Sequence, residues 1–528
     1  TTPARVSDWQ GQMRVALLLW LATLVLFLSG LGIEPLRDWD EGTYAQVARE
    51  MRAGGTLELV FPTLWGDPFF LKPPLGPALI ALGFMAFNES SIAARLPLAV
   101  LSSALVPLLY LVARTAGMGR QAALMGAAIC LTLLPVMRHG RLAMLDGPSV
   151  ALALAALLFL LKAATGGAGW ALGAGLALSA MALIKGLLAV PFLVLGLALL
   201  LALRAPALAS GRFWGAFALG LVPVLSWQVA QLWHHGAAYA RIALFDQSVA
   251  RIPESVEGNA GPVWYYALEI LKFGWPWLVF LPAGLAVSWR MRAQGWSVLV
   301  LLWAGGFLLL VTLMPTKLPW YHYPAWPALA LICGVGLESA LQRRHAPERM
   351  ILPVLAVAGG AAAWYFSPLG PDSVPALLVA GIVLALGSPL TFWQWQRNPR
   401  LGGGLLLGLI YGVLLLFALS GRSVWELNED YPVVPVAAAI RHHVPADLPL
   451  FTTHPHHRPS LDFYAVRPVL PRPGTLLHSA LYEDAPTYWV VHARDLAEID
   501  ETTVTLLSAI GVMRLIRAGG EGTQDAGQ

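Results

Sequence analysis

The sequence has few charged residues. Of its 528 residues only 12% are Asp, Glu, Lys or Arg, whereas 57% are hydrophobic, and the mean hydropathy is +0.65. An ordinary soluble domain carries about 25% charged residues. The shortage of charge therefore excludes the soluble class and indicates a polytopic α-helical membrane protein.

Cysteine is also scarce, and several common motifs are missing. Cys130 and Cys333 both lie in apolar runs, so we interpret them as small buried side chains and exclude a disulfide framework. Walker, Rossmann and zinc-protease patterns do not occur, which argues against a nucleotide site. The net charge of +4 sits mostly in short loops, so we expect membrane lipids as partners and no nucleic acid.

Long apolar segments, in contrast, are plentiful. Thirteen of them are candidate membrane helices of the length that a bilayer requires, and we interpret the first as a retained span. The pair 168–184 and 187–203 could also be one broken span. The thirteen are residues 13–33, 95–115, 121–137, 147–164, 168–184, 187–203, 212–233, 267–288, 296–313, 324–340, 350–366, 374–395 and 402–420.

The loop charges predict an orientation. If the N-terminus is cytoplasmic, every inner loop contains Lys or Arg, as in SWRMRAQG and QRRHAPERM. This is the positive-inside pattern. It predicts a multi-pass protein of a bacterial inner membrane, with an active site that faces the periplasm.

The composition divides the chain in two. We expect a transmembrane catalytic domain over residues 1–420, with outer juxtamembrane helices in 34–94, among them an interfacial helix at 74–87. Residues 421–528 carry frequent charges and predict a small periplasmic α/β domain. There PLFTT and YWVVHA are typical of strands, residues 434–444 and 494–510 of helices, and the final GGEGTQDAGQ of a disordered tail.

Acidic residues follow the first apolar segment. Asp40 and Glu41 precede the helical pattern GTYAQVAREMRAGG. They could simply begin a helix, where acids suit the free amides, or one could act as a general base at the membrane surface. Neighbours on a helix point in different directions, so we expect only one of them in the site.

A second acid, Asp146, stands at the boundary of a span in GRLAMLDGPS. A carboxylate beside an apolar wall is costly unless it is paired or functional. It could form an ion pair with Arg141, or it could orient an acceptor or a basic group in the site.

Two lysines lie in proline-rich outer loops. Lys72 is in PFFLKPPLGP and Lys317 is in MPTKLPWYHYP. Lysines at a membrane edge often only extend toward the headgroups, but the prolines favour fixed cations. Two ammonium groups suit a phosphate and a carboxylate suits an incoming hydroxyl, so these residues together predict a polyprenyl-phosphate-linked substrate.

Two features are less specific. The long outer loop 243–266 contains Asp246, Arg251 and Glu254, and long loops are often lids. The run THPHHR contains His454, His456 and His457, but no acid or cysteine completes a metal set. We therefore name no metal ligand, although a divalent metal stays possible as a cofactor.

Four motifs together resemble the GT-C superfamily of membrane glycosyltransferases. They are WDEGTYAQVAREM, FLKPPLG, RLAMLDGPS and TKLPWYHYP. Within that superfamily the chain is similar, over most of residues 13–340, to the bacterial branch that contains the lipid A aminoarabinose transferase and relatives of the protein O-mannosyltransferases.

The resemblance implies roles for individual residues. Asp40 would be the catalytic carboxylate, Tyr44 the tyrosine of its motif and Asp146 the second acid. Lys72 and Lys317 would contact the donor phosphate, and Tyr321 would line the donor site. Our candidate set is Asp40, Glu41 and Asp146 for catalysis and Tyr44, Lys72, Arg141, Arg251, Lys317 and Tyr321 for substrate binding.

The chain departs from the aminoarabinose transferases at three points. One is the long outer loop, where the resemblance implies a histidine and this chain has Asp246 and Gln247 in the neighbourhood. The chain also has Gly42-Thr43 where they have an arginine before the tyrosine, and Leu71 where they have a glutamate before the loop lysine. The sugar and the acceptor therefore stay open.

The function that we expect is transfer of a sugar from a polyprenyl (undecaprenyl) phosphate to a lipid A-like or other cell-envelope glycan, with inversion and Asp40 as base. The alternatives are a protein O-mannosyltransferase-like activity and a transporter or flippase for a lipid-linked sugar. A transporter should carry charges in the middle of its spans, whereas here nearly all lie at the outer ends.

Overall fold

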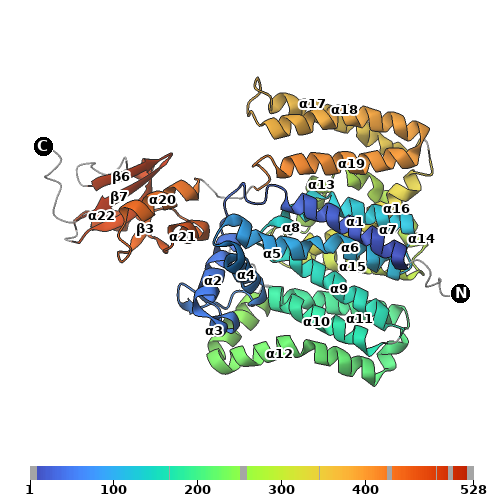
Figure 1. Ribbon diagram of the computed structural model, residues 1–528, viewed down its shortest axis with the longest axis horizontal. Coiled ribbons are helices and arrows are strands. Elements are labelled where there is room, and N and C mark those ends of the chain that lie inside the picture. The colour runs from blue at the N-terminus through green and yellow to red at the C-terminus, as the bar shows by residue number, and fades with distance from the viewer. Residues whose placement is uncertain are drawn as a thin grey trace.

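Apolar segments of the chain fold as helices that lie side by side in one block, and a smaller unit is attached at one end of it (Figure 1). The computed structural model describes residues 9–165, 167–249, 259–343, 345–424, 431–482, 485–496 and 504–519. We call α1 and α5–α19 the helical block and residues 431–519 the C-terminal unit.

A helix covers most of each of the thirteen predicted segments. In the part of the chain that the structure describes, eight helices are long and apolar enough to cross a membrane, or up to ten if each bent pair is one span. The count of thirteen spans stays a prediction. Several of the thirteen segments contain two consecutive helices, so sixteen α-helices of the described residues cover them. The helices are α1 (Trp9–Leu28), α5 (Ser91–Ser103), α6 (Leu105–Thr115), α7 (Arg120–Leu131), α8 (Leu134–Arg141), α9 (Asp146–Ala163), α10 (Ala168–Lys185), α11 (Ala189–Ala202), α12 (Gly211–Tyr239), α13 (Tyr265–Phe273), α14 (Leu281–Arg290), α15 (Gly295–Leu313), α16 (Trp326–Ala340), α17 (Ile351–Tyr365), α18 (Pro375–Arg397) and α19 (Pro399–Ala418).

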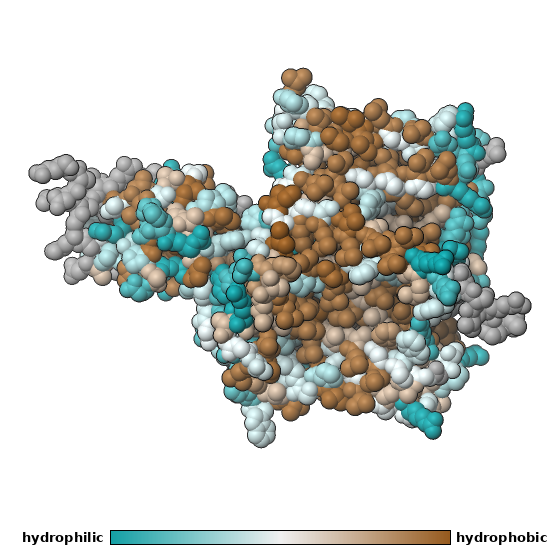
Figure 2. All heavy atoms as spheres, viewed as in Figure 1, coloured by the Kyte–Doolittle hydropathy of each residue, from teal (hydrophilic) through white to brown (hydrophobic). Residues whose placement is uncertain are grey.

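The surface of the block fits a lipid environment. Hydrophobic residues cover the face seen in Figure 2, and hydrophilic residues gather on the C-terminal unit and at the opposite end of the block. A wide exposed apolar band is unusual for a soluble protein, and here it belongs to a multi-pass membrane protein.

Three short helices and a hairpin form a layer between the block and the C-terminal unit. They are α2 (Asp40–Gly54), α3 (Thr56–Val60), α4 (Leu75–Phe87), and the antiparallel strands β1 (Thr63–Leu64) and β2 (Asp67–Pro68). Helix α4 confirms the helix expected at 74–87. Its position at the membrane interface stays a prediction.

The C-terminal unit contains a mixed five-stranded sheet in the order β4-β3-β5-β7-β6. Strand β3 pairs in parallel with β4 and β5, and β7 pairs antiparallel with β5 and β6. The strands are β3 (Leu450–Thr452), β4 (Val469–Pro471), β5 (Thr487–His492), β6 (Val504–Ile510) and β7 (Met513–Ala518), and the helices are α20 (Val433–His443), α21 (Pro459–Ala465), α22 (Gly474–Ala480) and α23 (Ala493–Leu496). The predicted α/β class is confirmed.

One prediction in this unit is wrong. We expected a helix over 494–510, but α23 ends at Leu496 and residues 504–510 form β6. The segment VTLLSAI pairs with β7 across the turn at Gly511, and this hairpin outweighs its weak helical pattern. The predicted disordered tail lies almost wholly outside the described residues.

Candidate active site

Helix α2 begins at Asp40, directly beyond the loop that leaves α1. Tyr44, one helical turn later and almost fully buried, donates its hydroxyl hydrogen to Asp40 Oδ1 over 3.1 Å. Asp40 as a whole residue stays partly exposed. Burial of its carboxyl group raises the pKa of Asp40, and the positive charges of Lys72 and Lys185 offset part of that rise. The Asp40 carboxylate is therefore held by Tyr44 and influenced by two cations.

The neighbouring Glu41 has a different environment. It is 1% exposed, and Arg95 of α5 binds both of its oxygens at 2.8 and 2.7 Å. The backbone amides of Ala143 and Arg37 donate to the same carboxylate at 2.6 and 3.0 Å. Burial alone would raise the pKa of Glu41, but the charge and hydrogen bonds of Arg95 lower it. In the structure Glu41 joins α2 to the helical block, because a buried carboxylate requires partners. The catalytic role that we expected for Glu41 stays a prediction.

Asp146 pairs with a lysine that we had not named as a site residue. It is the first residue of α9, and its Oδ1 lies 2.5 Å from the Nζ of Lys185, the last residue of α10. An acid at a helix N-terminus and a base at a C-terminus both suit the helix dipoles. The predicted alternative of an Asp146–Arg141 ion pair is wrong, and Asp146 holds a basic group.

Lys72 follows the β1–β2 hairpin, which a carboxylate of α2 holds in place. Glu50 accepts hydrogen bonds from the Thr63 hydroxyl at 2.6 Å and from the Trp65 and Gly66 amides at 2.7 and 3.2 Å. The prolines of this loop predicted its stiffness, whereas the Glu50 anchor was not visible in the sequence. The loop places Lys72 near enough to lower the pKa of Asp40.

Lys317 does not offer its ammonium group to the acids in this structure. Its Nζ donates to the carbonyl oxygens of Val311, Thr312 and Met314 at 3.0, 2.7 and 2.5 Å, and the side chain is buried. The last carbonyls of a helix have no partner within the helix, and Lys317 satisfies those at the end of α15. Lys317 therefore caps α15 in this structure, and its contact with the donor phosphate stays a prediction.

Three further residues, Arg141, Tyr321 and Arg251, were predicted to bind substrate. Arg141 is buried and donates to the Ser423 hydroxyl at 3.2 Å and to the Ser29 carbonyl, so it joins the α8 end to the segment after α19. The substrate role of Arg141 stays a prediction. Tyr321 is partly buried against the helical core, and its role stays a prediction. Arg251 lies outside the described residues.

Two of these groups, Lys185 and Arg95, were not among the predicted site residues. Lys185 ends an apolar helix and is followed by Gly186 at φ +46°, and a cation at the outer end of a span is a recognisable signal. Arg95 lies within a span, and an ionisable residue inside the membrane marks a paired or functional group. Both signals were present in the sequence.

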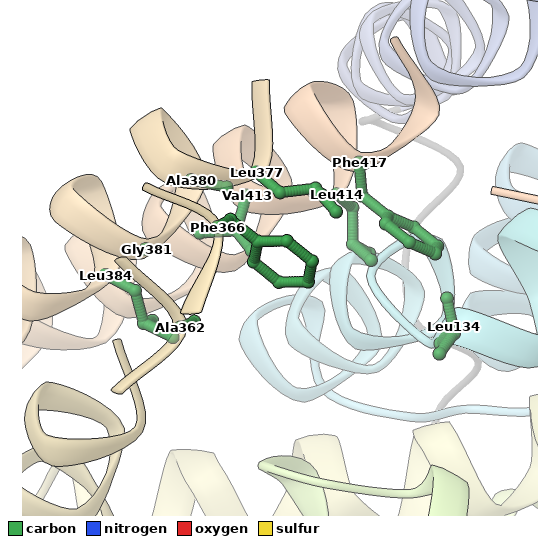
Figure 3. A pocket seen from close by; sticks show the side chains of 10 residues that line it. All are labelled: Leu134, Ala362, Phe366, Leu377, Ala380, Gly381, Leu384, Val413, Leu414 and Phe417. Atoms are coloured by element: carbon green, nitrogen blue, oxygen red, sulfur yellow. The ribbon is translucent and has the colours of Figure 1, made fainter. Parts of the chain in front are cut away.

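An apolar pocket between α8, α17, α18 and α19 is not the reaction site. Figure 3 shows ten lining residues, from Leu134 to Phe417, and none of them has an ionisable side chain. The three histidines of THPHHR also have protein contacts: His454 Nδ1 contacts the His456 carbonyl, and His457 pairs with Asp462. Within the described ranges, no three His, Cys, Asp or Glu side chains converge as a metal site would require.

The sequence matches known membrane transferases. The family described as dolichyl-phosphate-mannose-protein mannosyltransferase matches residues 71–227. The undecaprenyl phosphate-alpha-4-amino-4-deoxy-L-arabinose arabinosyl transferase 1 of Pseudomonas fluorescens is 30% identical over 417 residues, which are 74% of each chain. The corresponding transferase of Edwardsiella ictaluri is 30% identical over 70% of this chain and 71% of its own. This chain belongs to the arabinosyl transferase family.

The fold agrees with that membership. ArnT from Cupriavidus metallidurans, solved with undecaprenyl phosphate bound, superposes with a TM-score of 0.75 over 98% of this chain and 100% of that one, at 19% identity. The archaeal oligosaccharyltransferase AglB from Archaeoglobus fulgidus superposes with a TM-score of 0.53 over 93% of this chain and 70% of its own, at 11% identity. The arabinosyl transferase family member described here is thus a multi-pass membrane glycosyltransferase with the GT-C fold.

Proposed function

We propose that this glycosyltransferase moves a sugar from undecaprenyl phosphate to a lipid A-like or other cell-envelope acceptor at the periplasmic face of the inner membrane. One observation carries the proposal. The positive charges of Lys72 and Lys185 act on the Asp40 carboxylate, whereas its neighbours Asp38 and Glu41 form buried ion pairs. A base beside positive charge suits the displacement of a phosphate by a hydroxyl.

The proposed reaction is a single displacement at the anomeric carbon. The acceptor oxygen forms a bond to that carbon from one side, and the bond to the phosphate oxygen breaks on the other, so the configuration inverts. The acceptor proton passes to Asp40, and the bonding electron pair leaves with the polyprenyl phosphate. Tyr44, which donates to Asp40, orients the carboxylate toward the acceptor.

Lys72 and Lys185 are the proposed phosphate contacts, in place of the earlier pair Lys72 and Lys317. Compact ammonium groups stabilise the negative charge that develops on the departing phosphate. Asp146 holds the Lys185 ammonium at 2.5 Å and so positions one of the two. Undecaprenyl phosphate as the carrier, and 4-amino-4-deoxy-L-arabinose as the first sugar to test, follow from the names of the relatives.

A protein O-mannosyltransferase-like activity is the second candidate. It is favoured by the family match over residues 71–227, a range that contains Lys72, Asp146 and Lys185 but not Asp40. The two candidates share the carrier lipid phosphate and the displacement, and differ in sugar and acceptor.

Purified protein in lipid vesicles tests the proposal. The vesicles would hold undecaprenyl phosphate-4-amino-4-deoxy-L-arabinose and lipid A, and mass spectrometry would follow the acceptor. We expect lipid A to gain one aminopentose. A second reaction would contain a mannosyl lipid as donor and a Ser/Thr peptide as acceptor. Product in that reaction alone would favour the second candidate. Movement of donor across the vesicle without transfer to either acceptor would support a flippase and overturn the proposal.

A further inference from the structure

A buried ion pair joins the C-terminal unit to the chain just before Asp40. Arg458 donates from Nε to Asp38 Oδ2, and the two side chains are 5% and 3% exposed. The Ser460 amide donates to Asp38 Oδ1 over 3.1 Å, and its hydroxyl donates to the same oxygen. We call Asp38, Arg458 and Ser460 the Asp38 clamp. A buried carboxylate with this many donors is costly to undock.

Arg458 is itself fixed within the C-terminal unit. It donates from Nη1 to the Tyr431 carbonyl at 2.9 Å, and its guanidinium lies 4.2 Å from the centre of the Tyr431 ring. The arginine is thus held before it meets Asp38, which lowers the entropy cost of the contact.

The backbone at Gly42 packs closely against the same part of the C-terminal unit, at Pro459 and Ser460. A Cβ atom at Gly42 would lie 2.4 Å from the Ser460 nitrogen and 2.6 Å from the Pro459 carbonyl carbon. Only glycine allows this approach without a shift of backbone. The close approach also explains Gly42 at a place where the resemblance led us to expect a longer side chain.

In the sequence, Asp40 lies between two residues that are held by different parts of the protein. Asp38 is held by the C-terminal unit, and Glu41 is held by Arg95 of the helical block. Only Trp39 and Asp40 lie between them, and Trp39 adopts φ 62° and ψ −102°. A bulky residue in this region of φ is strained and persists only where its surroundings enforce it.

We propose that the C-terminal unit is a working part of the active site: through the Asp38 clamp, Arg458 and Ser460 are positioning residues that hold the Asp40 carboxylate for the reaction. The inference rests on the proposed function, since it takes Asp40 as the base. A second readout, which needs no transfer activity, separates the two.

Four variants of the full-length protein test the Asp38 clamp, and one of them is the conservative Arg458→Lys. Arg458→Gln removes the ion pair, and Ser460→Ala removes one hydroxyl and should disturb folding least. Arg49→Gln is the matched control, because Arg49 also binds the C-terminal unit, at the Phe463 carbonyl over 3.0 Å, but does so from the third turn of α2. The measurements are amide hydrogen exchange over residues 38–44 and the kcat and KM of sugar transfer.

We expect Arg458→Gln to speed exchange at Gly42 and Thr43, whose amides donate to Arg37 and Trp39 carbonyls. Its kcat should fall about 100-fold, the scale for a catalytic group displaced by about 1 Å, with the donor KM at the parent value. Ser460→Ala should show both effects more weakly, Arg458→Lys should recover part of the rate, and Arg49→Gln should match the parent.

Parent-like exchange in Arg458→Gln and Ser460→Ala would overturn the Asp38 clamp, as would faster exchange with unchanged kcat. An equal loss of kcat in Arg458→Gln and Arg49→Gln would show that any contact between α2 and the C-terminal unit has this effect. That result would also overturn the Asp38 clamp. If exchange responds as expected while the parent protein transfers no sugar, the clamp stands and the proposed function fails.

Discussion

At the scale of single residues, three carboxylates within four positions receive three different partners. Asp38 binds Arg458 of the C-terminal unit, Glu41 binds Arg95 of α5, and Asp40 accepts only the Tyr44 hydroxyl among the hydrogen bonds described. The residue with the fewest donors keeps the reactive lone pairs. Removing each carboxylate should therefore have a different consequence.

The first prediction separates Asp40 from Glu41. Asp40→Asn should fold and bind the donor but transfer sugar about 10²–10⁴-fold more slowly, the usual cost of losing a general base. Glu41→Gln leaves the buried Arg95 without its charge partner and should cost about 3–5 kcal/mol of stability. Thermal unfolding and transfer rates of both variants check this. A stable Glu41→Gln with normal unfolding would contradict the anchoring role.

The second prediction separates the lysines. Lys185→Met and Lys72→Met should each weaken donor binding by about 1.5–3 kcal/mol, the range for a hydrogen bond to a charged group. Lys317→Met should leave donor affinity unchanged and lower the unfolding temperature, because its ammonium serves the α15 carbonyls. Titration of all three variants with the donor lipid, together with thermal unfolding, measures these effects. Weak donor binding in Lys317→Met alone would restore our original assignment.

The third prediction concerns pH. The pKa of Asp40 is raised by burial and lowered by Lys72 and Lys185, and a base acts only when deprotonated. The acid limb of kcat/KM should therefore lie above the ordinary aspartate value of about 4. In Lys72→Met the pKa of Asp40 should rise further, so the limb should move to higher pH. A limb that moves to lower pH in this variant would show that Asp40 is not the titrating group.

At the scale of elements, helix α2 organises the site by using three of its sides. Its first turn presents Asp40, Glu50 near its end holds the β1–β2 hairpin before Lys72, and Arg49 contacts α21. Helix α21 in turn places Phe463 against Phe84 of α4, with ring centres 6.0 Å apart. One short helix therefore connects the proposed base, the loop cation and the C-terminal unit.

The fourth prediction tests how α21 is held. His457 lies 2.7 Å from Asp462, and this hydrogen bond raises the pKa of His457. A raised histidine pKa adds stability that is complete below the unfolded value of about 6.5 and is lost as pH rises through the folded pKa. His457→Gln should therefore lower the unfolding temperature most below that pH and little at high pH. A difference in unfolding temperature between parent and variant that grows as pH rises would contradict the His457–Asp462 ion pair.

At the scale of the whole molecule, the site lies where two separately packed parts meet. The C-terminal unit has its own sheet and cores on both faces, yet its Arg458 reaches the segment that begins α2. Figure 1 shows α1 starting at the far end of the helical block, away from this unit. The reaction side and the C-terminal unit should thus share one side of the membrane.

The fifth prediction is the orientation itself. A reporter fused after residue 528 should report the periplasm, and one inserted in 341–349, a loop with several arginines, should report the cytoplasm. Protease accessibility of the two sites in sealed spheroplasts provides an independent measurement. The same compartment at both positions would contradict the orientation that the proposed function requires.

The sequence by itself determined the class of the molecule and showed where its candidate site residues lie along the chain. Hydropathy over about 20 residues and loop charge are local properties, so they indicated a membrane protein with helices in the right places. The acidic motif at residues 39–44 and the loop around Lys72 were also identified, because prolines and helix-start patterns act over a few residues.

Only the tertiary structure decided which charges face each other. Lys317 and Lys185 both stand at the end of an apolar helix, but one folds back on carbonyls of its own helix end and the other reaches Asp146. The Asp38–Arg458 pair spans 420 positions, and the strand at 504–510 exists because β7 pairs with it. Such partners are set by packing between distant segments, since a buried charge must find a counter-charge wherever the fold brings one.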